Sequence, residues 1–525
     1  MKKCPKCGRE YDNTMSFCLD DGSELLYGPA SMDEPATAIL AEAAAFRTGG
    51  EATAIFKQSS PAVEPNSIAV LPFAHLSSQP DDEFFCDGLA EELINALTKI
   101  ESLKVAARTS AFSFKATNKK IGEIAQALGV NKILEGSVRK AGDRVRITVQ
   151  LINAADGYQI WSERYDREMQ DIFAVQDEIT LAVVEALKVK LLSNERVAVL
   201  KKATDDPEAY EFYLRGRVFW NRRTPADLHK AIANFEKAIE IDPEYSLAFS
   251  GLADSYTLLT YFEEYAPHEL RERTRECALK AVELDEASAE AHTSMALYRL
   301  IYEFDLQAAD HHFRKALDLN PRLVTAQYLY GTHLATQLHF DEAVAHGKIA
   351  LDLDPLNQAL NGNIARVLYF LGRFDEAIEL ANKNLELAPN FFFMHWALGV
   401  CYRQKADFER ALDHLQKAVS FSGLVALKGD LGVAYALAGK EAEARSILAE
   451  LEARSKESYV SPQWPAVIYA ALGDKEKALD CLESAWDVRA VQLLWLRIDP
   501  NFAPLRLEPR FIEILEKTGV ATSMN

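Results

Sequence analysis

The stretch YGTHLATQLHFDEAVAHGKIALDLDP, residues 330–355, decides the fold of most of this chain. It reads as two helices joined by a short turn and closed by a proline, which cannot continue a helix. The closing motif recurs as EIDP, DLNP, DLDP and ELAP, with prolines at 243, 321, 355 and 389. The last three prolines follow one another at intervals of 34 residues. This fixed period predicts a stack of helical hairpins, each of which needs its neighbours to bury its apolar face.

The small residues of this unit fall where two helices would cross closely. Gly331 lies in the first helix, and Ala343 and Ala350 lie in the second. A larger side chain at such a crossing would force the helices apart. The pattern resembles the tetratricopeptide repeat, and it predicts about eight units in residues 205–490, followed by a capping helix and tail in residues 491–525. Longer loops at 221–228 and 261–273 are expected to bulge from one end of the array.

Composition describes an ordinary globular protein, with 49% hydrophobic and 26% charged residues among 525. This length exceeds what one core supports, so three or more domains are expected. The formal net charge of −20 argues against nucleic acid or anionic lipid as the main partner. No run of about 18 apolar residues and no signal peptide are evident, so the sequence predicts a cytoplasmic protein without membrane insertion.

The start of the chain, CPKCGREYDNTMSFCLDDG from residue 4 to 22, has metal-ligand spacing. Two Cys-x2-Cys-like turns, each followed by glycine, would hold Zn²⁺ through Cys4, Cys7, Cys18 and Asp21. Zinc accepts a carboxylate as well as thiolates, so Asp21 can stand where a fourth cysteine is usual. Residues 1–25 are therefore predicted to form a small structural zinc ribbon. A redox Cys-x2-Cys pair is the alternative.

Residues 26–65 are rich in Ala, Pro, Gly, Ser and Thr, and no apolar period is sustained there, which predicts a flexible linker. Two segments within it, EPATAIL and EATAIF, nearly repeat each other. They place Thr37 and Thr53 in equivalent positions, which are candidate phosphorylation sites for a phosphothreonine-binding partner. Chance similarity in a low-complexity segment is the alternative.

Residues 66–195 are predicted to be an α+β domain. SIAVLPF (67–73) reads as a buried strand, and residues 82–100 carry apolar side chains at helical spacing. A second strand and helix follow, and then strands with period-two alternation around residues 132–168. A final helix is expected over residues 171–192. The order is strand, helix, strand, helix, a three-stranded meander and a closing helix.

This segment resembles the domain shared by the amino-terminal region of TolB and the flagellar protein FlgO. The resemblance rests on Gly88, residues 134–138, Trp161 and Asp166. It implies a non-enzymatic domain that in bacterial regulators often precedes tetratricopeptide repeats. Similar domains also occur beside adenylate cyclase, protein kinase or winged-helix DNA-binding modules, and no such motif is found in this chain.

A basic row lies near the predicted hairpin of this domain. It is expected to be the solvated face of an antiparallel sheet. The alternative is a site for an anion or a nucleotide. The residues are Arg139, Lys140, Arg144 and Arg146.

In the tetratricopeptide family the first helix of each repeat lines the concave face. Carried over by position, this implies a partner-binding surface of aromatic and arginine side chains, the composition of a binding hot spot. Core packing is the alternative, for Trp396 in particular. The predicted residues are Tyr328, Arg366, Tyr369, Phe393, Trp396 and Arg403.

The sequence thus predicts a multidomain chain: a small zinc ribbon, an α+β domain, and an all-α tetratricopeptide superhelix. Its predicted function is a non-enzymatic scaffold or adaptor for protein or peptide partners in bacterial signalling. Two alternatives stay open. One is a transcription regulator that uses the zinc ribbon, although acids outnumber bases there and nucleic-acid readers are basic. The other is a nucleotide or small-ligand sensor in residues 66–195.

Overall fold

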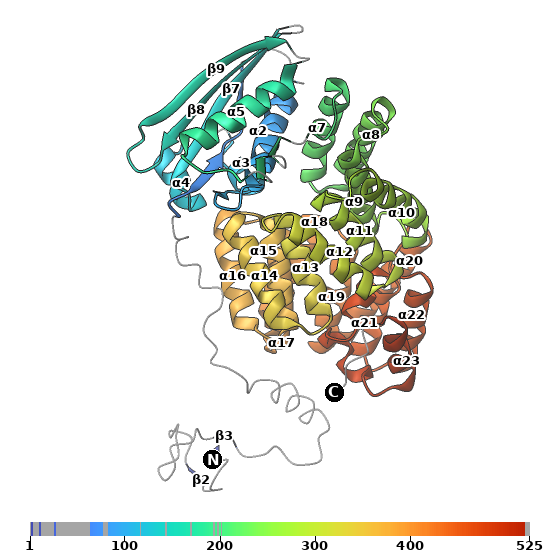
Figure 1. Ribbon diagram of the computed structural model, residues 1–525. Coiled ribbons are helices and arrows are strands. Elements are labelled where there is room, and N and C mark those ends of the chain that lie inside the picture. Colours follow the sequence, from blue (N-terminus) through green and yellow to red (C-terminus); the bar gives the residue numbers. More distant parts are fainter. Residues whose placement is uncertain are drawn as a thin grey trace. The chain divides into compact units, whose positions relative to one another are not determined.

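The computed structural model (Figure 1) describes residues 64–76, 82–115, 117–141, 144–168, 171–192, 195–196, 199–200 and 202–519, and the backbone of three short strands before them. The chain divides into two units, residues 1–55 and 56–525. In the first unit, β1 (Lys2–Lys3) pairs antiparallel with both β2 (Glu10–Tyr11) and β3 (Leu26–Tyr27). The predicted zinc ligands Cys4, Cys7, Cys18 and Asp21, and the threonines Thr37 and Thr53, lie outside the described residues.

The second unit begins with an α/β region built on a six-stranded sheet of order β6-β4-β7-β8-β9, with β5 beside β7. The strands β4, β5 and β6 lie parallel to their neighbours, whereas β7, β8 and β9 form an antiparallel meander. The order of elements is the predicted one with two short additions, the strand β5 and a helix over residues 108–112. The strands are β4 (Ser67–Val70), β5 (Ala74–His75), β6 (Lys104–Val105), β7 (Lys132–Ala141), β8 (Arg144–Asn153) and β9 (Gln159–Glu168).

Helices cover one face of this sheet and part of the other. The helices α2 (Asp82–Thr98) and α5 (Ile172–Ala186) bury apolar side chains against the side of β8 that carries Ile147 and Val149. The short helices α3 (Arg108–Phe112) and α4 (Ile121–Leu128) cover the opposite side near β4. The outward side of β7, β8 and β9 is left polar, because period-two alternation sends every second side chain there.

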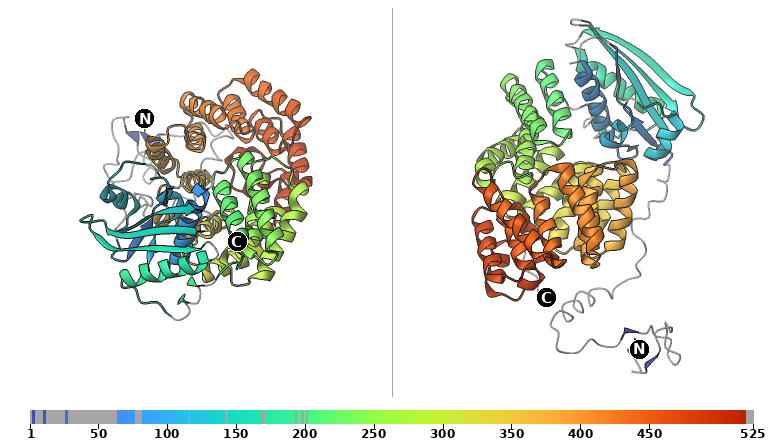
Figure 2. Two further views of the ribbon diagram at one scale, coloured as in Figure 1. Left: turned by 90° about the horizontal axis from the view of Figure 1, so that it is seen from above. Right: turned by 180° about the vertical axis from the view of Figure 1, so that it is seen from behind.

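Eight helix pairs follow between residues 207 and 487, and Figure 2 shows them from two further sides as a superhelix coloured green to red. A π-helical turn, η2 (Arg299–Glu303), extends α11. The pairs are α7 (Pro207–Asn221) with α8 (Pro225–Ile241), α9 (Ser246–Tyr261) with α10 (Pro267–Leu284), α11 (Ala289–Tyr298) with α12 (Leu306–Leu319), α13 (Val324–Thr336) with α14 (Phe340–Leu353), α15 (Gln358–Phe370) with α16 (Phe374–Leu387), α17 (Phe392–Gln404) with α18 (Phe408–Ser422), α19 (Ala426–Leu437) with α20 (Glu441–Ser455), and α21 (Gln463–Ala471) with α22 (Lys475–Asp487).

The small residues predicted from the 34-residue period lie where two helices cross closely. A Cβ atom added at Gly331 would lie 3.0 Å from the Ala343 carbonyl oxygen, and one at Gly399 would lie 2.5 Å from a Leu415 side-chain carbon. These glycines therefore let the two helices of a pair approach closely. The second helices α12, α14 and α16 each end two residues before a repeat proline.

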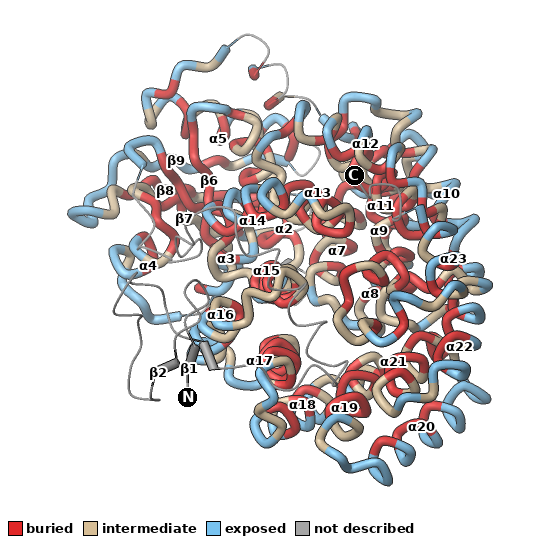
Figure 3. The backbone as a smooth tube through the Cα atoms, turned by 90° about the horizontal axis from the view of Figure 1, so that it is seen from below, coloured by how far each residue is buried: buried red, intermediate tan, exposed pale blue. Residues whose placement is uncertain are grey.

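The array ends in two 3₁₀ segments, η3 (Val491–Trp495) and η4 (Pro500–Leu505), and the helix α23 (Pro509–Lys517). Phe511 and Ile514 of α23 are buried, which fits a cap over the last core layer. Figure 3 shows how burial is distributed: α17 is buried along most of its length, whereas α20 and α22 alternate between buried and exposed faces. The inner helices of the array are thus covered on more sides than the outer ones.

Candidate functional site: the inner side of the repeat array

Equivalent positions in consecutive repeats contact one another on the inner helices. The Arg403 guanidinium donates to the Tyr369 hydroxyl at 3.1 Å, and the two residues are 34 apart. The Trp396 indole N–H donates to a carboxylate oxygen of Asp430 at 2.8 Å, at the same 34-residue offset. Asp430 also accepts from Arg403 at 2.9 Å. A ladder of polar contacts therefore links α15, α17 and α19.

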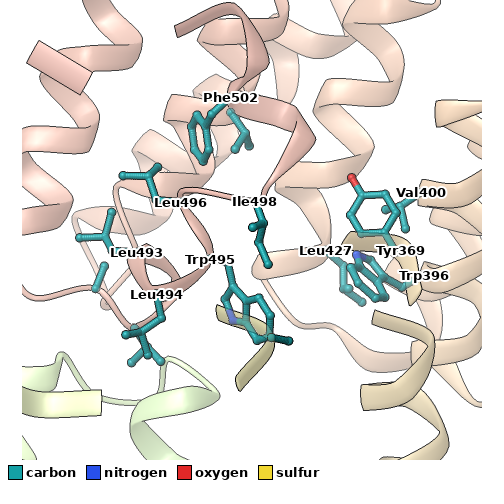
Figure 4. Packing of buried hydrophobic residues seen from close by; sticks show 14 of the residues in the cluster. Tyr369, Trp396, Val400, Leu427, Leu493, Leu494, Trp495, Leu496, Ile498 and Phe502 are labelled. Atoms are coloured by element: carbon teal, nitrogen blue, oxygen red, sulfur yellow. The ribbon is translucent and has the colours of Figure 1, made fainter. Parts of the chain in front are cut away.

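The chain's own C-terminal segment lies against this ladder. Trp495 of η3 stacks on Phe370, with ring centroids 4.7 Å apart, and the Arg366 guanidinium lies 4.7 Å above the Trp495 ring. Asn501 of η4 accepts from Arg403 at 2.8 Å. Figure 4 shows Trp495 and Ile498 in the same packed cluster as Tyr369 and Trp396.

The structure corrects the expectation that these side chains line an open groove. Arg366, Tyr369, Trp396 and Arg403 keep only 8%, 2%, 7% and 3% of their surface exposed. Their aromatic and hydrogen-bonding groups are used within the fold, which agrees with the core-packing alternative for Trp396. Tyr328 and Phe393 are half-buried, and partner binding by these two stays a prediction.

The loop after α9 also packs inside the fold. Glu263, held at a positive φ of 60°, accepts from the Trp464 indole N–H at 2.7 Å and from the Gln492 side-chain amide at 2.9 Å. The neighbouring Tyr261 hydroxyl accepts from Arg366. The predicted outward bulge of this loop is therefore wrong, because its side chains join the second repeat to the end of the array. Burial raises the pKa of Glu263 to about 7 against the effect of these hydrogen bonds.

An apolar pocket on the array is lined by residues of α13, α14 and α15. Tyr328 and Thr332 of α13 face Asn363 and Val367 of α15 across it. Its floor comes from α14, where Gly347 has no side chain to fill the space. The Asn363 side chain is held in place because it accepts from Arg366 at 2.6 Å. Its lining is mostly apolar, and its cavity volume of about 20 Å³ makes it an indentation of the surface between the helices.

The predicted basic row is split by the pleat of the sheet. Arg139, Arg144 and Arg146 lie on the open polar face, where Asp166 pairs with Arg146 at 2.5 Å and with Arg144 at 3.4 Å. Lys140 lies on the other face and pairs with Glu211 of α7 at 3.3 Å. The open face is therefore the solvated antiparallel face that was expected, and its arginines are partly neutralised by Asp166.

The α/β region is fixed to the array near α7. Gly88 lets α2 approach closely, because a Cβ atom there would lie 2.6 Å from Leu214. Beside it, buried Glu91 binds Arg108 at 2.7 Å and Arg217 of α7 at 3.0 Å. Burial opposes ionisation of Glu91, and the two guanidinium groups outweigh it and hold its pKa below the usual range.

A second attachment lies at the turn between α14 and α15. The backbone N–H and the hydroxyl of Ser110 both donate to Asp354, at 2.8 and 2.5 Å, and the Leu356 N–H donates to the Ser110 hydroxyl at 2.9 Å. Ala107 N–H donates to the Leu353 carbonyl at 2.8 Å. Nothing in the sequence indicates that Asp354, within a repeat-closing motif, makes this contact.

Several other residues of the site were also missed. Asp430 and Asn501 carry no local motif, and Asn363 and Val367 look like ordinary helix positions. The 34-residue offset could have found Asp430, since it stands one repeat after Trp396. Among the described residues, no three His, Cys, Asp or Glu side chains are grouped to hold a metal ion, and no helix is long and apolar enough to cross a membrane.

Comparisons with known families agree with these two regions. Residues 64–182 match the model of the HilA/YgeH-like transcriptional regulator, second domain. Residues 226–245 and 363–424 match tetratricopeptide repeat models.

Curated relatives match this chain over part of its length. Putative adenylate cyclase 3 of Rhizobium meliloti (strain 1021) is 36% identical over 248 residues, which cover 47% of this chain and 42% of that protein. Transcriptional regulator HilA of Salmonella paratyphi A is 22% identical over 379 residues, 70% of this chain and 66% of HilA. Human mitochondrial import receptor subunit TOM70 is 25% identical over 233 residues, 43% of this chain and 37% of that protein. The chain thus spans less than two thirds of each relative. It is a tetratricopeptide repeat protein whose preceding α/β region matches the second domain of HilA-like regulators.

Proposed function

We propose that this protein is a non-enzymatic scaffold that binds an extended peptide segment of a partner protein, in bacterial signalling or regulation. The observation that carries the proposal is the tetratricopeptide array, matched at residues 226–245 and 363–424, and its proposed contact point is the indentation between α13, α14 and α15. It lies where the inner helices of two neighbouring repeats leave space, and Tyr328 and Asn363 offer polar groups beside apolar walls. Repeat arrays present extended surfaces of this kind to partner segments. The ladder of polar contacts that links α15, α17 and α19 is buried, so its side chains support the pocket and do not themselves contact the peptide.

Peptide selection followed by one pocket-filling variant tests this. Peptides would be selected from a random displayed library against the full chain, and their affinities measured by fluorescence anisotropy. Thr332→Trp fills the pocket and is expected to weaken binding about tenfold or more. Ala345→Trp places the same ring on an exposed position of α14 and should leave the affinity unchanged. Peptides that bind both variants equally would refute the pocket as the site.

We further propose that Cys4, Cys7, Cys18 and Asp21 hold a structural Zn²⁺. The donor set fits the metal, since three thiolates and one carboxylate complete a tetrahedral site and leave no open position. We also propose that Thr37 and Thr53 are phosphorylation sites. The proposed compartment is the cytoplasm. Metal analysis of the purified full chain should give about one zinc per chain, and Cys7→Ser should lose it.

Transcription control is the second candidate function, favoured by the match of residues 64–182 to the HilA-like family model. In this reading the zinc ribbon would contact DNA. A gel-shift assay with the full chain before and after chelation tests it. Zinc-dependent binding that weakens steeply with salt would support the regulator, and absence of binding at low salt would discard it.

A further inference from the structure

The strand β9 is an unusually long edge. Over Gln159–Glu168 it pairs with β8, and no other described strand lies beyond it in the sheet order, as Figure 1 also shows. Proteins usually shield such edges with short strands, proline or covering segments. β9 has ten residues and no proline. Two large apolar side chains at its start, Tyr158 and Ile160, are 77% and 44% exposed.

The charges along β9 are ordered so that the strand complements itself. Glu163 and Arg164 precede Tyr165, and Asp166 and Arg167 follow it. If two copies pair antiparallel with Tyr165 opposite Tyr165, Arg164 faces Asp166 of the other copy, and Glu163 faces Arg167. The two-fold axis repeats both pairs, so four opposite-charge pairs form. Directly opposed charges of unlike sign stabilise paired strands, and like charges destabilise them.

Antiparallel registers shifted by one or two residues bring like charges opposite each other. A shift of one residue places Glu163 opposite either Asp166 or Glu168. A shift of two residues places Arg164 or Asp166 opposite its own copy. A parallel arrangement in register opposes every charge to itself. Among these registers the charge order therefore favours the antiparallel one about Tyr165, which forms the four opposite-charge pairs.

The pleat of the sheet keeps each pair on a common face. Arg164 and Asp166 lie on the open polar face, where Asp166 already binds Arg146 and Arg144. An added Arg164 from a second copy would extend that cluster. Glu163 and Arg167 lie on the other face and are exposed, with Arg167 only 3.2 Å from Glu178 of α5. Tyr165 between them is buried, which anchors the centre of the strand in its own sheet.

We infer that β9 is a homodimer interface, in which two copies of this chain join their sheets antiparallel about Tyr165. The partner is a second copy because the strand's own charge order is its complement. This inference is independent of peptide binding at the repeats.

Charge swaps on full-length protein test the register. Glu163→Arg alone would oppose two arginines, and Arg167→Glu alone would oppose two glutamates. Each single variant should weaken self-association, measured by sedimentation velocity, about tenfold or more. An equimolar mixture of the two variants restores both pairs across the interface and should dimerise like the wild type. Recovery in the mixture separates the interface from any local misfolding, because a misfolded chain would not regain a partner.

Arg445→Glu on exposed α20 is the matched control, since it makes the same charge change away from β9 and should leave dimerisation unchanged. Circular dichroism would establish that every variant is folded. A wild type that stays monomeric throughout the micromolar range would overturn the inference. So would singles that dimerise normally, or a mixture that stays as weak as the singles.

Discussion

Asp430 is the residue on which the buried polar contacts of the inner helices converge. It accepts hydrogen bonds from Trp396 and Arg403, and its carboxylate also lies 3.3 Å from the Asn501 amide nitrogen. The Arg403 side chain has no exposed surface, so its charge depends on this partner. Removing one member of a buried pair leaves the other charged and unsatisfied.

Asp430→Ala should therefore lower the free energy of unfolding by about 3–5 kcal/mol. The measurement is the urea unfolding midpoint, followed by circular dichroism. Asp413→Ala serves as the control, because its partner Lys417 is a surface residue that stays solvated. Equal midpoints for Asp430→Ala and wild type would contradict the buried-pair interpretation.

At the residue scale, the sequence indicates which aromatic and arginine side chains come together, but not whether they are buried or exposed. The aromatic and arginine side chains of α15 and α17 were recognised as a cluster, and they do come together. Their burial could not be predicted, because the covering residues Trp495 and Asn501 lie about a hundred positions away and follow no repeat pattern. Glycine and alanine positions were predicted reliably, since close helix crossing has a direct local signature.

Individual helix pairs share a recurring polar contact at their inner turn. His292 and His395 of first helices each place one ring nitrogen on the carbonyl six residues earlier, at 3.0 and 2.9 Å. Their other ring nitrogens face His312 and His414 of the second helices at 2.9 and 3.0 Å. In the first of the two repeats between them, Gln327 takes the first-helix position and binds both the Pro321 carbonyl and a histidine of α14.

These histidine pairs should make the array sensitive to acid. Burial, with the neighbouring ring adding to it, lowers the pKa of both His312 and His414 to about 4, below the ordinary 6.5. The unfolded chain then binds more protons between pH 4 and 6.5, so the contribution of these groups to stability is lost as pH falls through that window. The double variant His292→Gln, His395→Gln copies the natural Gln327 arrangement.

This double variant should keep the pH 7 melting temperature and lose less of it between pH 7 and pH 5 than the wild type. His339→Gln, at an exposed position, is the control and should follow the wild type. Identical slopes for all three proteins would show that His312 and His414 do not titrate as inferred. At this scale the sequence was most informative, since helix ends, prolines and small residues all repeat every 34 positions.

The whole molecule is held together by contacts between distant parts of the array, and Glu263 is central to one of them. Its pKa is raised to about 7 from an ordinary 4.5, so the folded state binds the proton more tightly than the unfolded state between these values. Stability is therefore lost as pH rises through this window. Glu263→Gln keeps an acceptor for Trp464 and Gln492 and removes the charge.

Glu263→Gln should be more stable than the wild type at pH 8 by about 1–3 kcal/mol and nearly equal to it at pH 5. Thermal unfolding of both proteins across this range is the measurement. Glu264→Gln, on the exposed neighbour, is the control. A constant difference between Glu263→Gln and wild type at all pH values would rule out titration of Glu263.

The α/β region followed by a helical array could be predicted from local periodicity, because strand alternation and the 34-residue repeat are properties of short windows. The attachment of the α/β region at Glu91 and Ser110 could not, since both depend on surface matching over long sequence separations. The loop at Glu263 was misjudged for the same reason: extra length in a loop does not reveal which way it folds.

The two attachments of the α/β region have a mechanical consequence. A simple array of stacked helix pairs, in which each pair contacts only its neighbours, is elastic because small rotations between pairs accumulate along it. Here one end of the stretch from α7 to α14 is fixed through Glu91 and the other through Ser110 and Asp354. The α/β region therefore restricts the rotation of the first four helix pairs, α7 to α14, relative to one another. The repeats after α15 are braced in another way, through the Glu263 contacts and the packing of Trp495 and Asn501, so tension along the chain has to break these contacts before the array extends.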